Sequence, residues 1–121
     1  MKVHEYQAKE ILSRAGVAVP RGEVARTPEE AEQIAEGMDK LVVKAQVHAG
    51  GRGKAGGIKI VSNSNEAKQA AGAMLGTRLT TFQTGPEGVP VSAVLVEEAL
   101  KVSRELYVGI VVDGAVEGVV L

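Results

Sequence analysis

The sequence contains no cysteine, which excludes disulfide bonds and thiolate metal sites. It also lacks tryptophan and has only one phenylalanine and two tyrosines, so its core has to be aliphatic. Because single-stranded nucleic acids are commonly held by stacking on aromatic rings, this shortage argues against nucleic-acid binding. Hydrophobic residues make up 45% of the 121 residues and charged residues 24%, which is typical of a globular protein with one modest core.

Neither charge nor hydropathy indicates a membrane or nucleic-acid partner. The formal net charge is −1, so bulk electrostatics attracts the chain to neither. No apolar run approaches the length of a membrane span. The first residues, MKVHEY, lack the apolar core of a signal peptide. We therefore expect a cytoplasmic protein.

Three stretches show the apolar spacing of helices: residues 4–15, the segment from Thr27 to Gly37, and the segment from Asn63 to Gly76. In the second, Thr27 is a natural N-cap, and Glu30 three residues later completes a capping box. Either Asn63 or Ser64 caps the third. The apolar stripe predicted to be buried on the first helix consists of Ala8, Ile11, Leu12 and Ala15.

Between these helices, β-branched runs predict strands at residues 22–25, 41–47, 57–61, 91–98, 105–113 and 116–121, and a short strand is possible at 80–84. Residues 22–25 are expected at a sheet edge. Asp113-Gly114 predicts a two-residue hairpin turn between the last two strands. The fold class is therefore α/β (α+β), with a mixed or antiparallel sheet and about three packed helices.

The most informative stretch is residues 41–61, which reads strand, glycine loop, strand. Lys44, Gln46 and His48 alternate onto one face of the first strand. The glycine loop, residues 50–57, carries Arg52 and Lys54 among five glycines. Glycine allows backbone N–H groups to approach phosphate oxygens, and the cations add charge. The pattern predicts an anion site; the alternative is a solvated hairpin tip and an edge-strand lysine.

Two familiar phosphate motifs do not fit. The spacing of Gly51, Gly53 and Gly56 matches the dinucleotide fingerprint, but a strand follows where that fingerprint requires a helix. A Walker A loop requires Ser or Thr where this chain has Ala55. A flap of two strands and a glycine loop laid over phosphates remains, physically akin to the glycine-rich loop of kinases.

The segment VVKAQVHAGGRGKAGG resembles the N-terminal signature of the β subunits of succinyl-CoA synthetase, the ADP-forming succinate–CoA ligase, and MKVHEYQAKEIL resembles the first helix of that family. The resemblance runs to the end of the chain. It implies an ATP-grasp fold, in which two lobes clamp ATP. Residues 1–98 would form the N-terminal lobe, and residues 99–121 the hinge and first hairpin of an incomplete second lobe.

The resemblance also implies roles for individual residues. Lys44 matches the lysine that contacts ATP phosphates, and the triplet Gly51, Arg52 and Gly53 matches the phosphate loop. A carboxylate or phosphate partner would offset the cost of burying Lys44 in an apolar strand.

For the nucleoside, Glu97 and Leu100 match the adenine hinge, Leu100 through its backbone, and Glu105 matches the ribose-binding acid. Solvated charges at strand ends are the alternative for both acids. Pro20 would lie near the purine and favours ATP over GTP.

The family activity implied is conversion of succinate, CoA and ATP to succinyl-CoA, ADP and phosphate in the tricarboxylic acid cycle, through an acyl phosphate and a phosphohistidine on the partner α subunit. The Mg²⁺ ligands and the α-subunit contact would lie beyond Leu121, so this chain has no predicted catalytic or metal residue and is expected to be inactive alone. Neither His4 nor His48 takes the phosphohistidine role. Alternatives are a malate–CoA ligase β subunit and a non-catalytic nucleotide-binding fragment.

Overall fold

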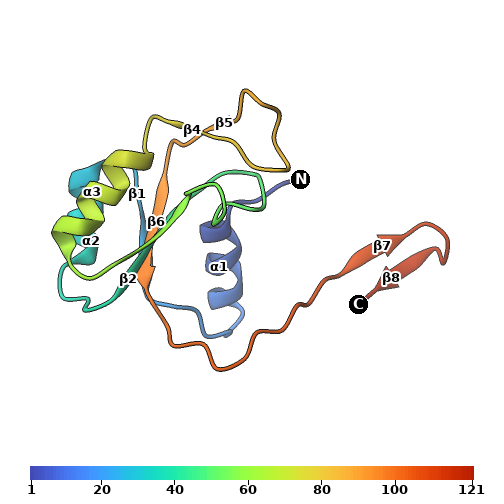
Figure 1. Ribbon diagram of the computed structural model, residues 1–121. Coiled ribbons are helices and arrows are strands. Elements are labelled where there is room, and N and C mark those ends of the chain that lie inside the picture. The colour runs from blue at the N-terminus through green and yellow to red at the C-terminus, as the bar shows by residue number, and fades with distance from the viewer.

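The computed structural model describes all 121 residues. Residues 1–98 form a body of one sheet and three helices, and residues 99–121 form an arm that runs away from it (Figure 1). No helix combines the length and apolar character needed to cross a membrane.

The body is built on a four-stranded sheet in the order β1, β6, β2, β3. These strands are Gly22–Ala25, Val94–Glu98, Leu41–Ala45 and Ile58–Val61, and every neighbouring pair is antiparallel. The predicted α/β class, antiparallel sheet and edge position of residues 22–25 are therefore confirmed. Two short hairpins complete the strands: β4 (Arg78–Leu79) with β5 (Val89–Pro90), and β7 (Val111–Asp113) with β8 (Gly118–Val120).

Helices α2 (Pro28–Ala35) and α3 (Ser64–Met74) cover one face of the sheet, and α1 (Glu5–Arg14) lies against the other (Figure 1). The predicted caps are confirmed, because Thr27 and Asn63 accept hydrogen bonds from the N–H groups of Glu30 and Glu66. The capping box differs in one contact. Glu30 accepts from the N–H of Arg26, one residue before the cap, rather than from Thr27.

The hydrophobic core lies almost wholly on the α2/α3 side. Alanines on both helices allow close approach to the valines of the sheet. The prediction that α1 buries an apolar stripe is wrong: α1 has no buried residue, and Ile11 is 60% exposed. Because α1 meets the sheet through polar side chains, its aliphatic residues face outward.

Three predicted strands need correction. Residues 80–84 form a turn, in which Thr84 Oγ1 accepts from the N–H of Thr81. Of residues 105–113, only the last three are strand. The final hairpin exists, but its loop is residues 114–117 rather than Asp113-Gly114. Asp113 Oδ1 accepts from the N–H of Ala115, and Glu117 takes a φ of +50°, so a longer turn replaces the tight one.

Candidate functional site

Lys44 stands on the face of β2 opposite the core, between Val43 and Ala45, which are fully buried. Strand β2 ends at Ala45 rather than at residue 47 as predicted, but Gln46 and His48 face the same side as Lys44, as expected. Gln46 Oε1 accepts from the N–H of Tyr6 at 3.2 Å, and the His48 ring stacks on His4 with centroids 3.8 Å apart. The polar side chains of Lys44, Gln46 and His48 therefore lie against α1 and the residue before it.

A cluster of alternating charges occupies this interface. Lys44 Nζ lies 2.9 Å from Glu5 Oε1 and 2.5 Å from Glu97 Oε1. Arg52 Nη2 lies 2.6 Å from Glu5 Oε2, while its Nη1 donates to the carbonyl of Ala45. Lys9 bridges the two acids, at 3.1 Å from Glu5 and 2.5 Å from Glu97. We call Glu5, Lys9, Lys44, Arg52 and Glu97 the charge cluster.

The charge cluster shifts the pKa values of Glu5 and Lys44 toward their ionised forms. Burial of Glu5 opposes ionisation, but hydrogen bonds from Lys44 and Arg52 outweigh it and lower the pKa of Glu5 to about 2. Burial likewise acts to lower the pKa of Lys44, but Glu97 and Glu5 outweigh it and raise that pKa. Three cations against two carboxylates leave one positive charge in excess, which suits an anionic ligand.

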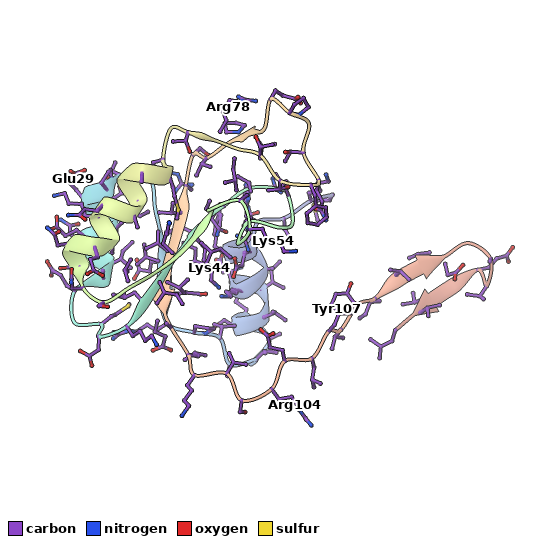
Figure 2. All side chains as sticks on the ribbon, viewed as in Figure 1. Glu29, Lys44, Lys54, Arg78, Arg104 and Tyr107 are labelled. Atoms are coloured by element: carbon purple, nitrogen blue, oxygen red, sulfur yellow. The ribbon has the colours of Figure 1, made fainter.

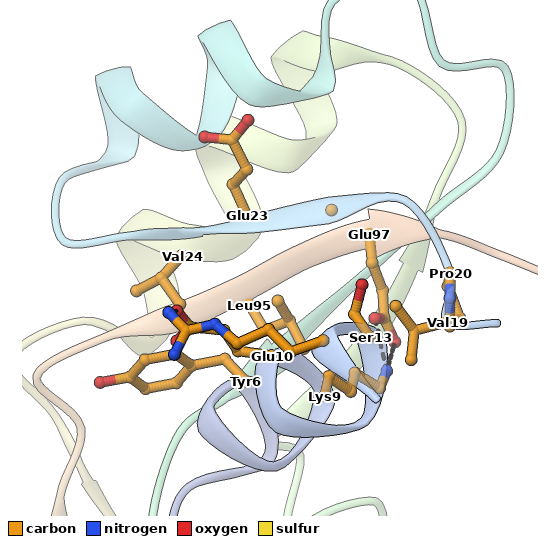
Figure 3. Close-up of a pocket in the computed structure, with 12 residues that line it drawn as sticks. Tyr6, Lys9, Glu10, Ser13, Val19, Pro20, Glu23, Val24, Leu95 and Glu97 are labelled. Atoms are coloured by element: carbon orange, nitrogen blue, oxygen red, sulfur yellow. Dashed lines mark hydrogen bonds and ion pairs between the residues drawn. The ribbon is translucent and has the colours of Figure 1, made fainter. Parts of the chain in front are cut away.

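Two clefts meet at the charge cluster. One, of about 440 Å³, lies between α1 and strands β1 and β6, with Pro20, Lys9 and Glu97 among its lining residues (Figure 3). The other, of about 510 Å³, lies between the glycine loop and the start of α1, and is lined by Glu5 and Arg52. The charge cluster therefore contributes residues to both clefts, Lys9 and Glu97 to the first and Glu5 and Arg52 to the second.

The glycine loop presents unused backbone donors. The N–H groups of residues 55, 56 and 57 close turns within the loop, but those of residues 51–54 donate to no group of the chain. Gly51 has a φ of +77°, and a Cβ there would lie 2.5 Å from the Phe82 ring. Only glycine combines that conformation with that contact. Residues 51–54 thus leave four successive backbone N–H groups without an acceptor in the chain.

The predicted adenine-hinge residues do not all join this site. The Glu97 carboxylate is 2% exposed and is bound by Lys9 and Lys44, so its side chain belongs to the charge cluster. A Cβ at Gly22, its partner across the β1–β6 pair, would collide with the Glu97 side chain. Leu100 is 59% exposed and its backbone makes no hydrogen bond within the chain.

Glu105 stands on the arm, exposed to solvent, and makes no ion pair. The structure thus brings together Lys44, Arg52, Glu97 and the glycines. Arg104 and Tyr107, on either side of Glu105, lie on the arm away from Lys44 (Figure 2).

No group of three or more His, Cys, Asp and Glu side chains in the chain has the arrangement of a metal site. His4 and His48 are stacked, and Nδ1 of His4 is buried without a hydrogen-bond partner. Burial, helped by His48 and Arg52, lowers the pKa of His4 and favours its neutral form.

Sequence reasoning missed Glu5 and Lys9, the two members of the charge cluster that α1 contributes. Their spacing of four residues on one helix face is the only sequence signal for them. That spacing is usually a solvent-exposed pair, and nothing local relates it to Lys44, which lies 39 residues beyond Glu5.

Comparison with known proteins identifies the fold family. The family model described as "ATP-grasp domain" matches residues 2–121. The chain is 57% identical over 120 residues to the succinate–CoA ligase [ADP-forming] subunit beta of Acidobacterium capsulatum, covering 95% of this chain and 31% of that protein. It is 53% identical over 123 residues to the Bacillus thuringiensis protein of the same name, covering 100% of this chain and 32% of that one.

The chain thus spans about a third of the length of the curated relatives it matches. The resemblance indicated by the two sequence motifs is confirmed over nearly the whole chain. With the family model covering residues 2–121, the chain belongs to the ATP-grasp domain family.

Proposed function

We propose that this chain forms the phosphate-binding half of a nucleotide site, with ATP as its ligand. Lys44 and Arg52 neutralise the phosphates, and the free N–H groups of residues 51–54 donate to their oxygens. The observation that carries the proposal is that Arg52 and the glycine loop line one cleft, while Lys44 contacts the same Glu5 carboxylate as Arg52. Such preorganised donors do most of the work in phosphoryl transfer.

The nucleoside belongs, in this proposal, at the cleft lined by Pro20 and Glu97. Leu100 follows β6 with a free backbone, as an adenine hinge requires. Glu97 acts indirectly, by fixing Lys44, and Glu105 reaches a ribose only if the arm closes over the cleft. Residues 1–98 would then be one lobe, and residues 99–121 the hinge and first hairpin of the next.

At the level of the whole enzyme, we propose the β subunit of a cytoplasmic, ADP-forming succinate–CoA ligase, as the names of its relatives indicate. The reaction joins succinate and CoA at the expense of ATP, and its α subunit would supply the phosphohistidine. The residues of this chain do not form a metal site of their own, so Mg²⁺ would be held by ATP and by residues outside it. The alternative, a malate–CoA ligase, would use malate in place of succinate, and the acid would bind outside this chain. An assay of the complete enzyme with succinate and with malate distinguishes the two activities.

Calorimetric titration of the chain with MgATP tests the proposal, with Lys44→Ala as the variant. Saturable binding that weakens by about 100-fold in the variant supports it, because a charge-assisted contact to phosphate is lost. Binding that the variant leaves unchanged would remove Lys44 from the site. Lys68→Ala, on α3 at the far side of the sheet, removes the same charge and should bind as the wild type does.

A further inference from the structure

Glu5 stands where a phosphate group would be expected. Its carboxylate bridges Lys44 and Arg52: Oε1 contacts Lys44 at 2.9 Å, and Lys9 at 3.1 Å, while Oε2 contacts Arg52 at 2.6 Å. Two oxygens of a phosphate group bridge a pair of cations in the same way. Glu5 and phosphate therefore require the same two side chains.

The position of Glu5 is accessible to a ligand. Together with Arg52 and the glycine loop it lines the 510 Å³ cleft. The second acid of the charge cluster differs, because Glu97 is buried beneath Lys9 and Lys44. If Glu5 is displaced, Glu97 still holds Lys44 in place and charged. Only one of the two carboxylates is thus free to be exchanged.

The attachment of α1 permits this exchange. The helix has no buried residue, and its aliphatic side chains face solvent. Ion pairs from Glu5 and Lys9, with the bond from Tyr6 to Gln46, connect it to the sheet. Moving Glu5 therefore costs no core packing, unlike any movement of α2 or α3.

We propose that Glu5 is an internal competitor for phosphate, which holds Lys44 and Arg52 until a polyphosphate displaces it. This inference rests on the proposed function and adds a competing carboxylate to the same site. Because Glu5 competes, an anion needs a higher concentration to bind. A single phosphate only replaces the Glu5 carboxylate between the two cations, whereas a triphosphate also reaches the free N–H groups of residues 51–54. The cleft thereby selects longer polyphosphates over orthophosphate.

Titration of the chain with sodium tripolyphosphate and with orthophosphate tests this. Glu5→Gln keeps the shape of the side chain and removes its charge. We expect tripolyphosphate to bind about tenfold more tightly to this variant, and the preference over orthophosphate to shrink, because one competing charge beside the ligand is gone. Glu32→Gln makes the same charge change on α2 and should bind as the wild type does. Equal or weaker binding by Glu5→Gln would overturn the inference.

A second measurement on the wild type does not depend on how the variant folds. When tripolyphosphate is added at pH 7, the carboxyl ¹³C resonance of Glu5 should shift, while that of Glu32 stays in place. Movement of the amides of residues 51–54 without Glu5 would overturn the inference. The proposed function fails separately: if Glu5 responds as expected but MgATP binds no better than tripolyphosphate, no nucleoside is recognised.

Discussion

The two faces of the central sheet are covered by helices in opposite ways. On one face, α2 and α3 bury alanines against valines in a continuous apolar core. On the other, α1 has no fully buried residue and is attached through ion pairs to Lys44, Arg52 and Glu97. Close apolar packing stabilises a fold but offers a ligand no chemistry, whereas the charged interface can exchange partners. We infer that the first face supplies stability and the second supplies binding.

The largest expected effect comes from disrupting the apolar core between the sheet and helices α2 and α3, which we call the apolar face. Leu41 is fully buried in β2, so Leu41→Ala should lower the free energy of unfolding by about 2–5 kcal/mol through lost burial and a cavity. Ile11→Ala, on the exposed side of α1, should change it by less than about 0.5 kcal/mol. Urea unfolding measures both. Similar losses in the two variants would contradict a one-sided core.

Removing the buried acid of the charge cluster should have the next largest effect. Glu97→Gln leaves Lys9 and Lys44 close together without the carboxylate between them, at a cost of about 2–3 kcal/mol. The matched control is Glu32→Gln, which breaks a more exposed pair with Lys68. Thermal unfolding of both variants distinguishes the sites, and a Glu97→Gln protein as stable as the control would show that the charge cluster is not buried in solution.

Acid should weaken the same interface to a smaller extent. The pKa of Glu5 is about 2 in the folded chain against an ordinary value of 4.5, so its stabilisation is complete above about pH 5 and disappears as the pH falls toward 2. Allowing for screening by solvent, this is about 1–2 kcal/mol. Unfolding of the wild type and Glu5→Gln between pH 5 and pH 2.5 measures it. Parallel stability curves would contradict the shift.

Local signals predicted the apolar face well. Thr27 and Asn63 cap α2 and α3 because capping depends on residues three positions apart, and Gly37 and Gly76 follow those helices at positive φ. Strand alternation correctly placed Lys44 on the polar side of β2. These features depend on short-range geometry, which a single sequence contains.

The charged face was predicted only in part. The apolar spacing of Ile11 and Leu12 indicated a buried stripe, but α1 packs through Glu5 and Lys9 instead. The ion pairs of Glu97 with two lysines were not predicted. Such contacts join residues 39 and 88 positions apart, which no local pattern encodes.

Mapping MgATP binding on the backbone amide NMR spectrum of the chain tests most directly whether the charged face is the binding face. We predict shifts that concentrate at residues 51–54, at Lys44 and at the start of α1, while the amides of α2 and α3 remain in place. Shifts centred on α2 and α3, or none at millimolar MgATP, would contradict the assignment of binding to the charged face.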